Sequence, residues 1–384
     1  MDDDERQVFA NLPAAMIEEM LQSSTTVGDV LLDNFQKTRD FSENLRSKLV
    51  DSGFLIHESQ FGYPQLPTTC AADGSYAIER LLSVDFTAAA AVAVEGLTPP
   101  SEKRYWEQPH HYVFVKEELH HPDTATVLRA IMLGHEIDLA AKAPHDLIML
   151  DGTLTLPVIY FNQAIHKSRE IHGLHCSHVF LREVEQYLED YLNIIKSERS
   201  DKQFVGLPKY STRREIGKMF DWPFQYNDRS LLTLILKAGE LTKPIPLEQP
   251  DQAWHLAMEK VQGRRNSNEK QLLEMGIVEA LRSIHIIYYR PHEWIPALRL
   301  EVAEAVVCNN HRLAILLQGV KYQCATPAML EPYPLYLADR SVKSVARAMP
   351  VFLQVTTQRV AEKYNGDIGE VYMALHGHRT DSGG

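Results

Sequence analysis

Two stretches of the sequence, Ala71-Ala72-Asp73-Gly74-Ser75 and Leu147-Ile148-Met149-Leu150-Asp151-Gly152-Thr153-Leu154, indicate how the chain folds. In each, an apolar run ends in Asp-Gly followed by a hydroxyl residue. An apolar run bounded by glycine is typical of a buried strand. Glycine then permits the tight turn or close backbone approach that follows. The pattern predicts that Asp73 and Asp151 end two buried strands, where two carboxylates can converge on a hard divalent cation.

The segments around these stretches predict an α/β fold. Residues 68–73, 80–95 and 111–117 have the composition of strands, and residues 122–143 have apolar positions at helical spacing. Residues 146–151 form the next expected strand. The predicted order is therefore β-β-β-α-β, which favours a mixed central sheet flanked by helices.

The remainder of the chain is predicted to be mostly helical, with a tail at 377–384 that we expect to be disordered. The further expected elements are helical stretches at 162–198, 211–220 and 228–238, a strand at 203–207, and a β-hairpin from residues 282–289 and 296–302.

Three regions are expected. Residues 1–60 form a helical N-terminal arm, which either packs on the main domain or contacts a second subunit. Residues 61–355 form the main domain, with a helical insertion at about 162–200. Residues 356–384 form a C-terminal helix and a flexible tail.

The composition limits the function classes. The formal net charge of the 384-residue chain is −12, which excludes a globally basic nucleic-acid binder. A local groove or a bound metal can still supply a positive field. No apolar run approaches the roughly 20 residues that span a bilayer, and the acidic start is unlike a targeting peptide, so a cytoplasmic protein is expected. The four cysteines are scattered and are expected to be reduced.

The two aspartates match the acidic residues of a two-metal site for phosphoryl transfer. Such sites gather three or four carboxylates around Mg²⁺ or Mn²⁺ ions about 3.5–4 Å apart, and oxygen ligands suit these ions. Glu136, on the predicted helix before the Asp151 strand, is the leading third ligand. Glu117 and Glu118, at the end of the third predicted strand, are its competitors. Asp339, after a proline-rich turn, is the fourth candidate.

With these residues assembled, the chain resembles the NurA nuclease family from about Gly62 to Val351. Each matching motif is short, but their shared order and spacing make chance unlikely. The motifs that carry the resemblance are Ala72-Asp73-Gly74-Ser75, Leu150-Asp151-Gly152-Thr153-Leu154, Val205-Gly206-Leu207-Pro208-Lys209-Tyr210-Ser211, Asp228-Arg229-Ser230-Leu231-Leu232, Arg299-Leu300-Glu301 and Tyr333-Pro334-Leu335 with Ala338-Asp339.

The resemblance implies an RNase H-like core and a DNA nuclease that depends on Mn²⁺ or Mg²⁺, with two ions expected. It also implies 5′-3′ exonuclease and single-strand endonuclease activities, a homodimer, and a partnership with a HerA-type hexameric ATPase that translocates DNA. Such a nuclease would act in DNA end resection and repair or in defence against phage and other foreign DNA.

The resemblance also implies roles for particular residues. Asp73, Glu136 and Asp151 match the family's acidic ligands. Asp339 falls where many members have histidine, and either residue type can bind a metal. Lys209 matches the family's lysine, which implies phosphate contact or charge neutralisation.

Two other functions remain open. A regulatory subunit of a ring ATPase would keep the fold without catalysis, and its sequence would not need the intact acidic set. An actin-like phosphotransferase also places Asp-Gly turns at strand ends, but it needs a glycine-rich adenosine loop that the sequence lacks. Basic residues at 209–218 and 260–270 either line a DNA path or form a solvated mixed-charge face.

Overall fold

The computed structural model describes residues 12–171, 173–261, 263–377 and 379–383, so the first eleven residues of the predicted arm lie outside it. The strands are β1 (Leu55–His57), β2 (Thr69–Arg80), β3 (Asp85–Glu95), β4 (His110–Glu118), β5 (Leu147–Asp151), β6 (Gln203–Leu207), β7 (Glu240–Thr242), β8 (Ile245–Pro246), β9 (Ile284–Arg290), β10 (Leu298–Ala303) and β11 (Arg379–Gly383).

The α-helices alternate with these strands and make the fold mixed α/β. They are α1 (Ala14–Asp51), α2 (Thr124–Lys142), α3 (Leu156–Glu170), α4 (His175–Lys196), α5 (Glu215–Met219), α6 (Asp228–Ile235), α7 (Ser267–Arg282), α8 (Glu304–Val307), α9 (Asn310–Gln323), α10 (Tyr333–Lys363) and α11 (Ile368–Ala374). Two 3-10 turns, Glu58–Phe61 and Met258–Lys260, complete the described elements.

One mixed sheet runs through the described part of the molecule, in the order β1-β7-β9-β10-β6-β5-β2-β3-β4, with β8 beside β9 and β11 beside β2. The three central strands β6, β5 and β2 are parallel, and the other pairs are antiparallel. The predicted order β-β-β-α-β is confirmed by β2, β3, β4, α2 and β5, and the predicted hairpin is confirmed by β9 and β10.

Helices cover both faces of the central strands. Ala72 and Leu150 lie in the same apolar cluster as Val127 and Ile131 of α2, on one face of the sheet. Their neighbours along the chain, Ala71 and Met149, belong to a second cluster with Leu335 of α10. Because both faces are buried, these strands are apolar throughout instead of alternating.

Several sequence predictions were wrong in their limits. The strand predicted to end at Asp73 continues to Arg80, so Asp73 lies inside a strand. The stretch 162–198 is two helices, α3 and α4, and it begins earlier, at Leu156. The tail that we expected to be disordered contains β11, which pairs with β2. The predicted helix at 211–220 is only the single turn of α5.

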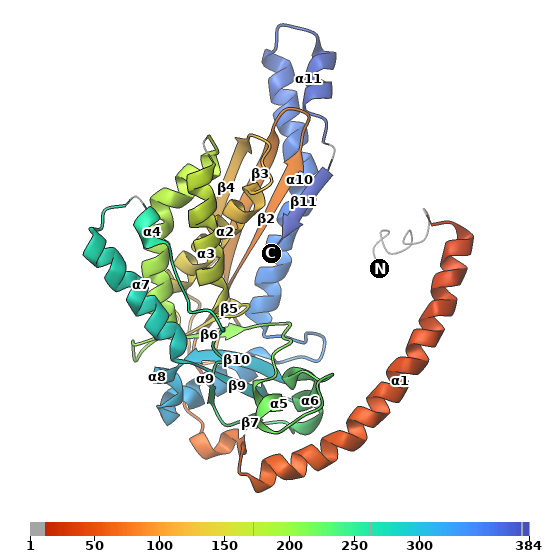
Figure 1. Ribbon diagram of the computed structural model, residues 1–384, viewed down its shortest axis with the longest axis vertical. Helices are drawn as coiled ribbons and strands as arrows, with labels where there is room; N and C mark the ends of the chain where they lie inside the picture. Colours follow the sequence, from red (N-terminus) through yellow and green to blue (C-terminus); the bar gives the residue numbers. More distant parts are fainter. Residues whose placement is uncertain (1–11, 172, 262, 378, 384) are drawn as a thin grey trace.

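Helix α1 extends away from the sheet, and Figure 1 shows it as a long red-to-orange curve on one side of the molecule. Its buried residues, Thr38, Ser42, Leu45 and Leu49, all lie in the second half. Among the exposed side chains of α1 are Met16, Met20, Leu21, Val27, Val30, Leu31, Leu32 and Phe35.

All four cysteines are free, as predicted. Among the described residues, no helix combines the length and the apolar character that a bilayer crossing requires.

Candidate metal centre

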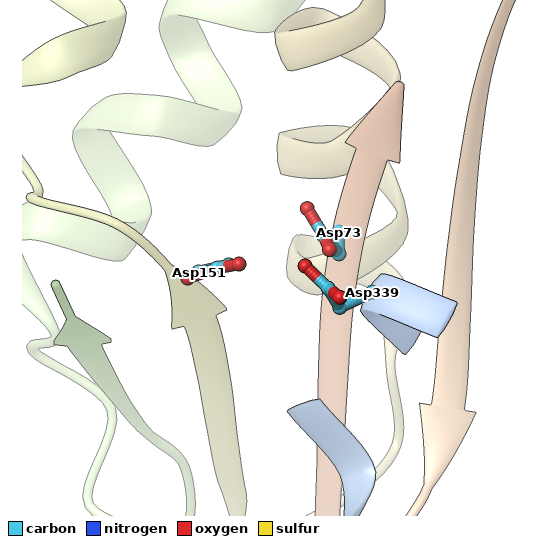
Figure 2. A group of neighbouring side chains, drawn as sticks. All are labelled: Asp73, Asp151 and Asp339. Carbon is cyan, nitrogen blue, oxygen red and sulfur yellow. The ribbon is translucent and has the colours of Figure 1, made fainter. Parts of the chain in front are cut away.

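Three aspartates from separate elements meet at the carboxyl end of β5. Asp73 comes from β2, Asp151 is the last residue of β5, and Asp339 comes from α10; Figure 2 shows the three side chains pointing toward one another. One carboxylate oxygen from each lies within 4.8 Å of the others. The sequence named all three, and the structure brings them together.

Strand register places two of these aspartates side by side. Strands β2 and β5 are parallel, and the last registered pair is Ala72 with Leu150. Asp73 and Asp151 are the next residues along each strand, so both side chains point to the face that α10 covers. Beyond this point β5 leaves the sheet, and the ladder on that side of β2 resumes only at Tyr76, which pairs with Gly383 of β11.

The two glycines of the motifs have different roles. Gly152 has a φ of +98°, which L-residues rarely adopt, so it provides the turn that releases the chain after Asp151. A Cβ atom on Gly74 would lie 2.6 Å from Cγ of Met132. Gly74 therefore lets α2 pack closely on β2 and brings Glu136 to the site.

Glu136 lies on α2, is 5% exposed, and lines the same cavity as the three aspartates. Burial, followed by the nearby charges of Asp73 and Asp151, raises the pKa of Glu136 well above its ordinary value. Its competitors lie elsewhere: Glu118 accepts hydrogen bonds from the backbone nitrogens of His175 and Cys176, at 2.8 and 2.6 Å, and caps the start of α4. Glu117 is exposed.

Lys209 places its ammonium group among the acids. Its Nζ atom lies 2.9 Å from Asp151 Oδ2, 2.9 Å from Asp339 Oδ1 and 3.1 Å from Glu331 Oε2. Burial alone would lower the pKa of Lys209, but the three carboxylates outweigh it and raise the pKa. Lys343, one turn after Asp339 on α10, is 2.9 Å from the same Asp339 oxygen.

The carboxylates differ in their electrostatic state. Burial, and then the charge of Asp151, raises the pKa of Asp73 to about 7, although the backbone N–H of Gly74 at 2.8 Å partly opposes this shift. Burial also raises the pKa of Asp151. The pKa of Asp339 is lowered because hydrogen bonds from Lys343 and Lys209 outweigh its burial.

The cavity suits a hard divalent cation. It has a volume of about 430 Å³, and four carboxylates face three cationic side chains around it: Asp73, Glu136, Asp151 and Asp339 against Arg129, Lys209 and Lys343. Carboxylate oxygens are the donors that Mg²⁺ and Mn²⁺ prefer. The convergence of carboxylate oxygens, and the ammonium already held between two of the acids, fit this donor set to a cation.

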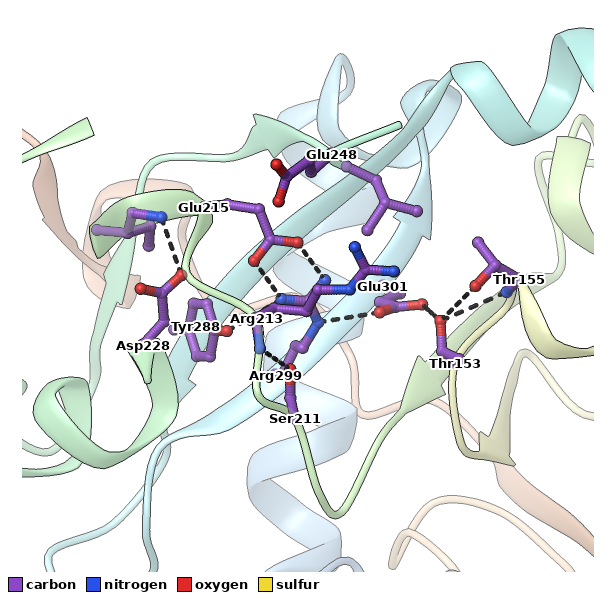
Figure 3. Close-up of polar contacts among 12 residues, drawn as sticks. Thr153, Thr155, Ser211, Arg213, Glu215, Asp228, Glu248, Tyr288, Arg299 and Glu301 are labelled. Atoms are coloured by element: carbon purple, nitrogen blue, oxygen red, sulfur yellow. Dashed lines mark hydrogen bonds and ion pairs between the residues drawn. The ribbon is translucent and has the colours of Figure 1, made fainter. Parts of the chain in front are cut away.

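A buried polar network supports the loop that follows Asp151 (Figure 3). Glu301 of β10 accepts hydrogen bonds from the Thr153 hydroxyl and from the Leu154 backbone nitrogen, the latter at 2.9 Å. Its other oxygen is 2.9 Å from Nε of Arg299. Glu215 binds the two terminal nitrogens of Arg299 at 2.9 and 3.0 Å.

The sequence assigned no role to Glu301, which stands in one of the motifs above, or to Glu331. Glu331 directly precedes the Pro332-Tyr333-Pro334 turn, and its contact with Lys209 joins segments more than 120 positions apart. The sequence signal for Glu331 is an acidic residue before a proline-rich turn, and this pattern does not identify Lys209 as its partner.

Most of the basic residues proposed for a DNA path bind the protein itself. The Arg214 guanidinium donates to backbone carbonyls, Lys218 pairs with Glu248, and Arg265 pairs with Glu189. Lys260 contacts His166, and Lys270 donates to the Val261 carbonyl. These contacts favour a structural role for the 260–270 segment.

Comparisons with known proteins identify a family and a shared fold. A family profile described as "NurA domain" matches residues 67–344. The crystal structure of the NurA nuclease from Sulfolobus solfataricus is 13% identical, and the match covers 92% of this chain and 99% of that one with a TM-score of 0.58. At this identity the likeness shows a shared fold.

Two further solved structures are similar to the chain. A NurA structure with manganese is 14% identical over 90% of this chain and 99% of that one, with a TM-score of 0.48. A NurA structure bound to dAMP and manganese is 13% identical over 84% and 93%, with a TM-score of 0.46. A search of curated protein sequences found no significant match.

Proposed function

The chain belongs to the NurA domain family, and on that premise we propose that it is a metal-dependent deoxyribonuclease. The observation that carries the proposal is the convergence of Asp73, Asp151 and Asp339 within 4.8 Å in a cavity that Glu136 also lines. We infer an RNase H-like core, because the acids stand on two adjacent central strands and two flanking helices.

Asp73, Asp151, Asp339 and Glu136 would hold Mn²⁺ or Mg²⁺, and we propose two ions. Divalent ions bound there would activate water and stabilise the leaving oxygen of a phosphodiester. Glu136 and Asp73 are the two buried members of this set of acids. Lys209 bridges Asp151 and Asp339, and at this position it would contact the phosphate of a bound DNA strand.

The family resemblance extends the proposal to the wider reaction. We propose 5′-3′ exonuclease and single-strand endonuclease activities, a homodimer, and action with a HerA-type hexameric ATPase in DNA end processing or in defence against foreign DNA. The net charge of −12 supports a nuclease to which a partner delivers DNA, because the isolated acidic chain attracts DNA weakly.

Cleavage by the purified chain tests the proposal. Linear single-stranded, circular single-stranded and linear duplex DNA are incubated with Mn²⁺, with Mg²⁺ and with EDTA, with and without the cognate ATPase. We expect cleavage with either metal, none in EDTA, and loss of at least a hundredfold in rate for Asp73→Asn. The matched control is Asp251→Asn, which makes the same change on an exposed loop.

Two results would contradict the proposal. Metal-dependent cleavage by folded Asp73→Asn at the wild-type rate would refute the assigned site. No cleavage by the wild-type chain under any of these conditions would favour the regulatory-subunit alternative.

A further inference from the structure

A second cavity adjoins the proposed metal centre. It has a volume of about 240 Å³ and shares Pro208, Lys209 and Tyr210 with the cavity of the acids. This volume is below the roughly 300 Å³ at which small-molecule sites begin, so the cavity accommodates part of one nucleotide. The residues that line only the second cavity are Leu207, Arg229, Pro296, Leu298, Arg299, Leu330, Glu331, Pro332 and Leu335.

Arg229 is the unusual side chain in this cavity. It lies on α6, is half-buried, and its Nε donates to the Ala297 carbonyl at 3.0 Å. Among the residues that the structure describes, neither terminal guanidinium nitrogen has a hydrogen-bond or ion-pair partner. Arginine stays charged in proteins, and a half-buried cation without an anion is unfavourable. Arg229 is therefore ready to bind an anion.

The other cationic groups of the cavity, Lys209 and Arg299, are already paired with carboxylates. Arg299 donates through all three nitrogens to Glu215, Glu301 and Tyr288. The Glu331 carboxylate lies 3.1 Å from Lys209 Nζ, an ammonium that it shares with Asp151 and Asp339. Among the described residues of this cavity, Arg229 is thus the cationic side chain without an ion-pair partner.

The remaining walls suit a nucleobase. Leucine and proline side chains supply most of the lining. Tyr210 is 95% exposed and lies at the boundary of both cavities. An exposed aromatic ring is a typical platform for stacking a base of single-stranded nucleic acid.

We propose that this second cavity binds the nucleotide adjacent to the scissile bond, with Arg229 on its phosphate and Tyr210 stacked on its base. The inference rests on the proposed nuclease function and adds a substrate subsite to it. It also assigns the protein a preference for an unpaired nucleotide at that position, because a stacked, paired base does not reach Tyr210.

Chemically modified oligonucleotides test the phosphate contact. One phosphate at a time is replaced by an uncharged methylphosphonate in a single-stranded substrate, and kcat/KM is measured with Mn²⁺. We expect one position next to the cleaved bond to lower kcat/KM about tenfold, the effect of a charged hydrogen bond. Arg229→Met should lower kcat/KM about tenfold on unmodified DNA and abolish the penalty at that position. Arg282→Met, which removes an exposed arginine on α7, is the matched control.

Abasic nucleotides test the base contact independently of how Arg229→Met folds. Tyr210→Leu alters an exposed side chain, so the fold should be retained. We expect an abasic nucleotide beside the cleaved bond to lower kcat/KM several-fold in the wild type and to have no further effect in Tyr210→Leu.

Oligonucleotide binding in EDTA, followed by fluorescence anisotropy, separates the two possible failures. Weaker binding by Arg229→Met, without cleavage by the wild type, would overturn the nuclease function and support the phosphate site. If the wild type cleaves DNA, but the methylphosphonate and Arg229→Met lower kcat/KM independently of each other at every position, the subsite is refuted and the nuclease function stands. Unchanged binding and unchanged kcat/KM in Arg229→Met would refute the subsite as well.

Discussion

Asp73 is a carboxylate in a place where burial opposes its charge. Its pKa is raised to about 7 in the folded chain, compared with about 3.9 in an unfolded one. A carboxyl group whose pKa is higher in the folded state than in the unfolded state lowers the free energy of unfolding when it ionises. The penalty is absent below pH 4, grows between pH 4 and 7, and is constant above.

We therefore expect Asp73→Asn to stabilise the metal-free protein at pH 8 and to leave it unchanged at pH 4. Thermal unfolding in EDTA at a series of pH values measures this. Mn²⁺ should raise the Tm of the wild type at pH 8 and have a much smaller effect on Asp73→Asn. A Tm difference between the two proteins that does not change with pH would contradict the assigned burial cost, and Asp251→Asn is the matched control.

The sequence was informative at the level of single residues where chemistry and local pattern coincide. Asp73 and Asp151 were found because each follows an apolar run and precedes glycine. Asp339 was proposed from its place after a proline-rich turn. Lys209 depended on the family resemblance, because nothing in its local pattern distinguishes it from a surface lysine. Glu331 was missed because its role arises only when the chain returns to Lys209.

At the scale of elements, β10 supports the end of β5. Glu301 connects the Thr153–Leu154 turn with Arg299, and its contacts with the Leu154 nitrogen and with Arg299 are buried. Removing one member of a buried ion pair costs about 3–5 kcal/mol. We expect Glu301→Leu to lower the free energy of unfolding by about 3 kcal/mol and to reduce kcat, because the turn that follows Asp151 loses its acceptor.

The isosteric variant Glu301→Gln is the control for this prediction. Its amide oxygen still accepts from the Leu154 nitrogen, whereas its amide nitrogen cannot accept from Nε of Arg299, so Glu301→Gln should lose less stability and less kcat than Glu301→Leu. Urea unfolding and kcat on one single-stranded substrate measure both effects. Equal losses in the two variants would contradict a positioning role for the carboxylate.

Helix α1 divides into a packed half and an exposed half. We expect deletion of residues 1–36 to leave the Tm nearly unchanged, because the deleted segment contains none of the buried residues of α1. Leu45→Ala should cost about 2–5 kcal/mol, because Leu45 is fully buried. If the exposed half forms the dimer, the deletion also lowers the mass measured by light scattering to that of a monomer.

The limits of the elements were harder to predict than their order. Strand β2 continues past Asp73 because α10 and α2 bury both of its faces and β3 pairs with it over its full length. The β11 segment has no apolar pattern of its own and becomes a strand by pairing with β2. Both outcomes depend on tertiary neighbours that a local pattern does not contain.

At the scale of the whole molecule, the net charge determines how strongly the protein attracts DNA. The chain carries −12, so attraction to DNA depends on a few local cations. Each phosphate contact with a single strand contributes about −0.7 to the slope of log K against log salt. We expect Arg229→Met to make that slope shallower by about 0.7, as measured by anisotropy in EDTA. Arg282→Met should leave the slope unchanged.

The register of β2 and β5 has a consequence for evolutionary divergence. Asp73 and Asp151 follow the paired residues Ala72 and Leu150 of parallel strands, so hydrogen bonds between backbones, about 4.8 Å apart, set the spacing of these two acids. Neighbouring side chains can be exchanged without altering that spacing. Substitutions around the site can therefore change the shape of its pocket while the distance between the two acids is kept.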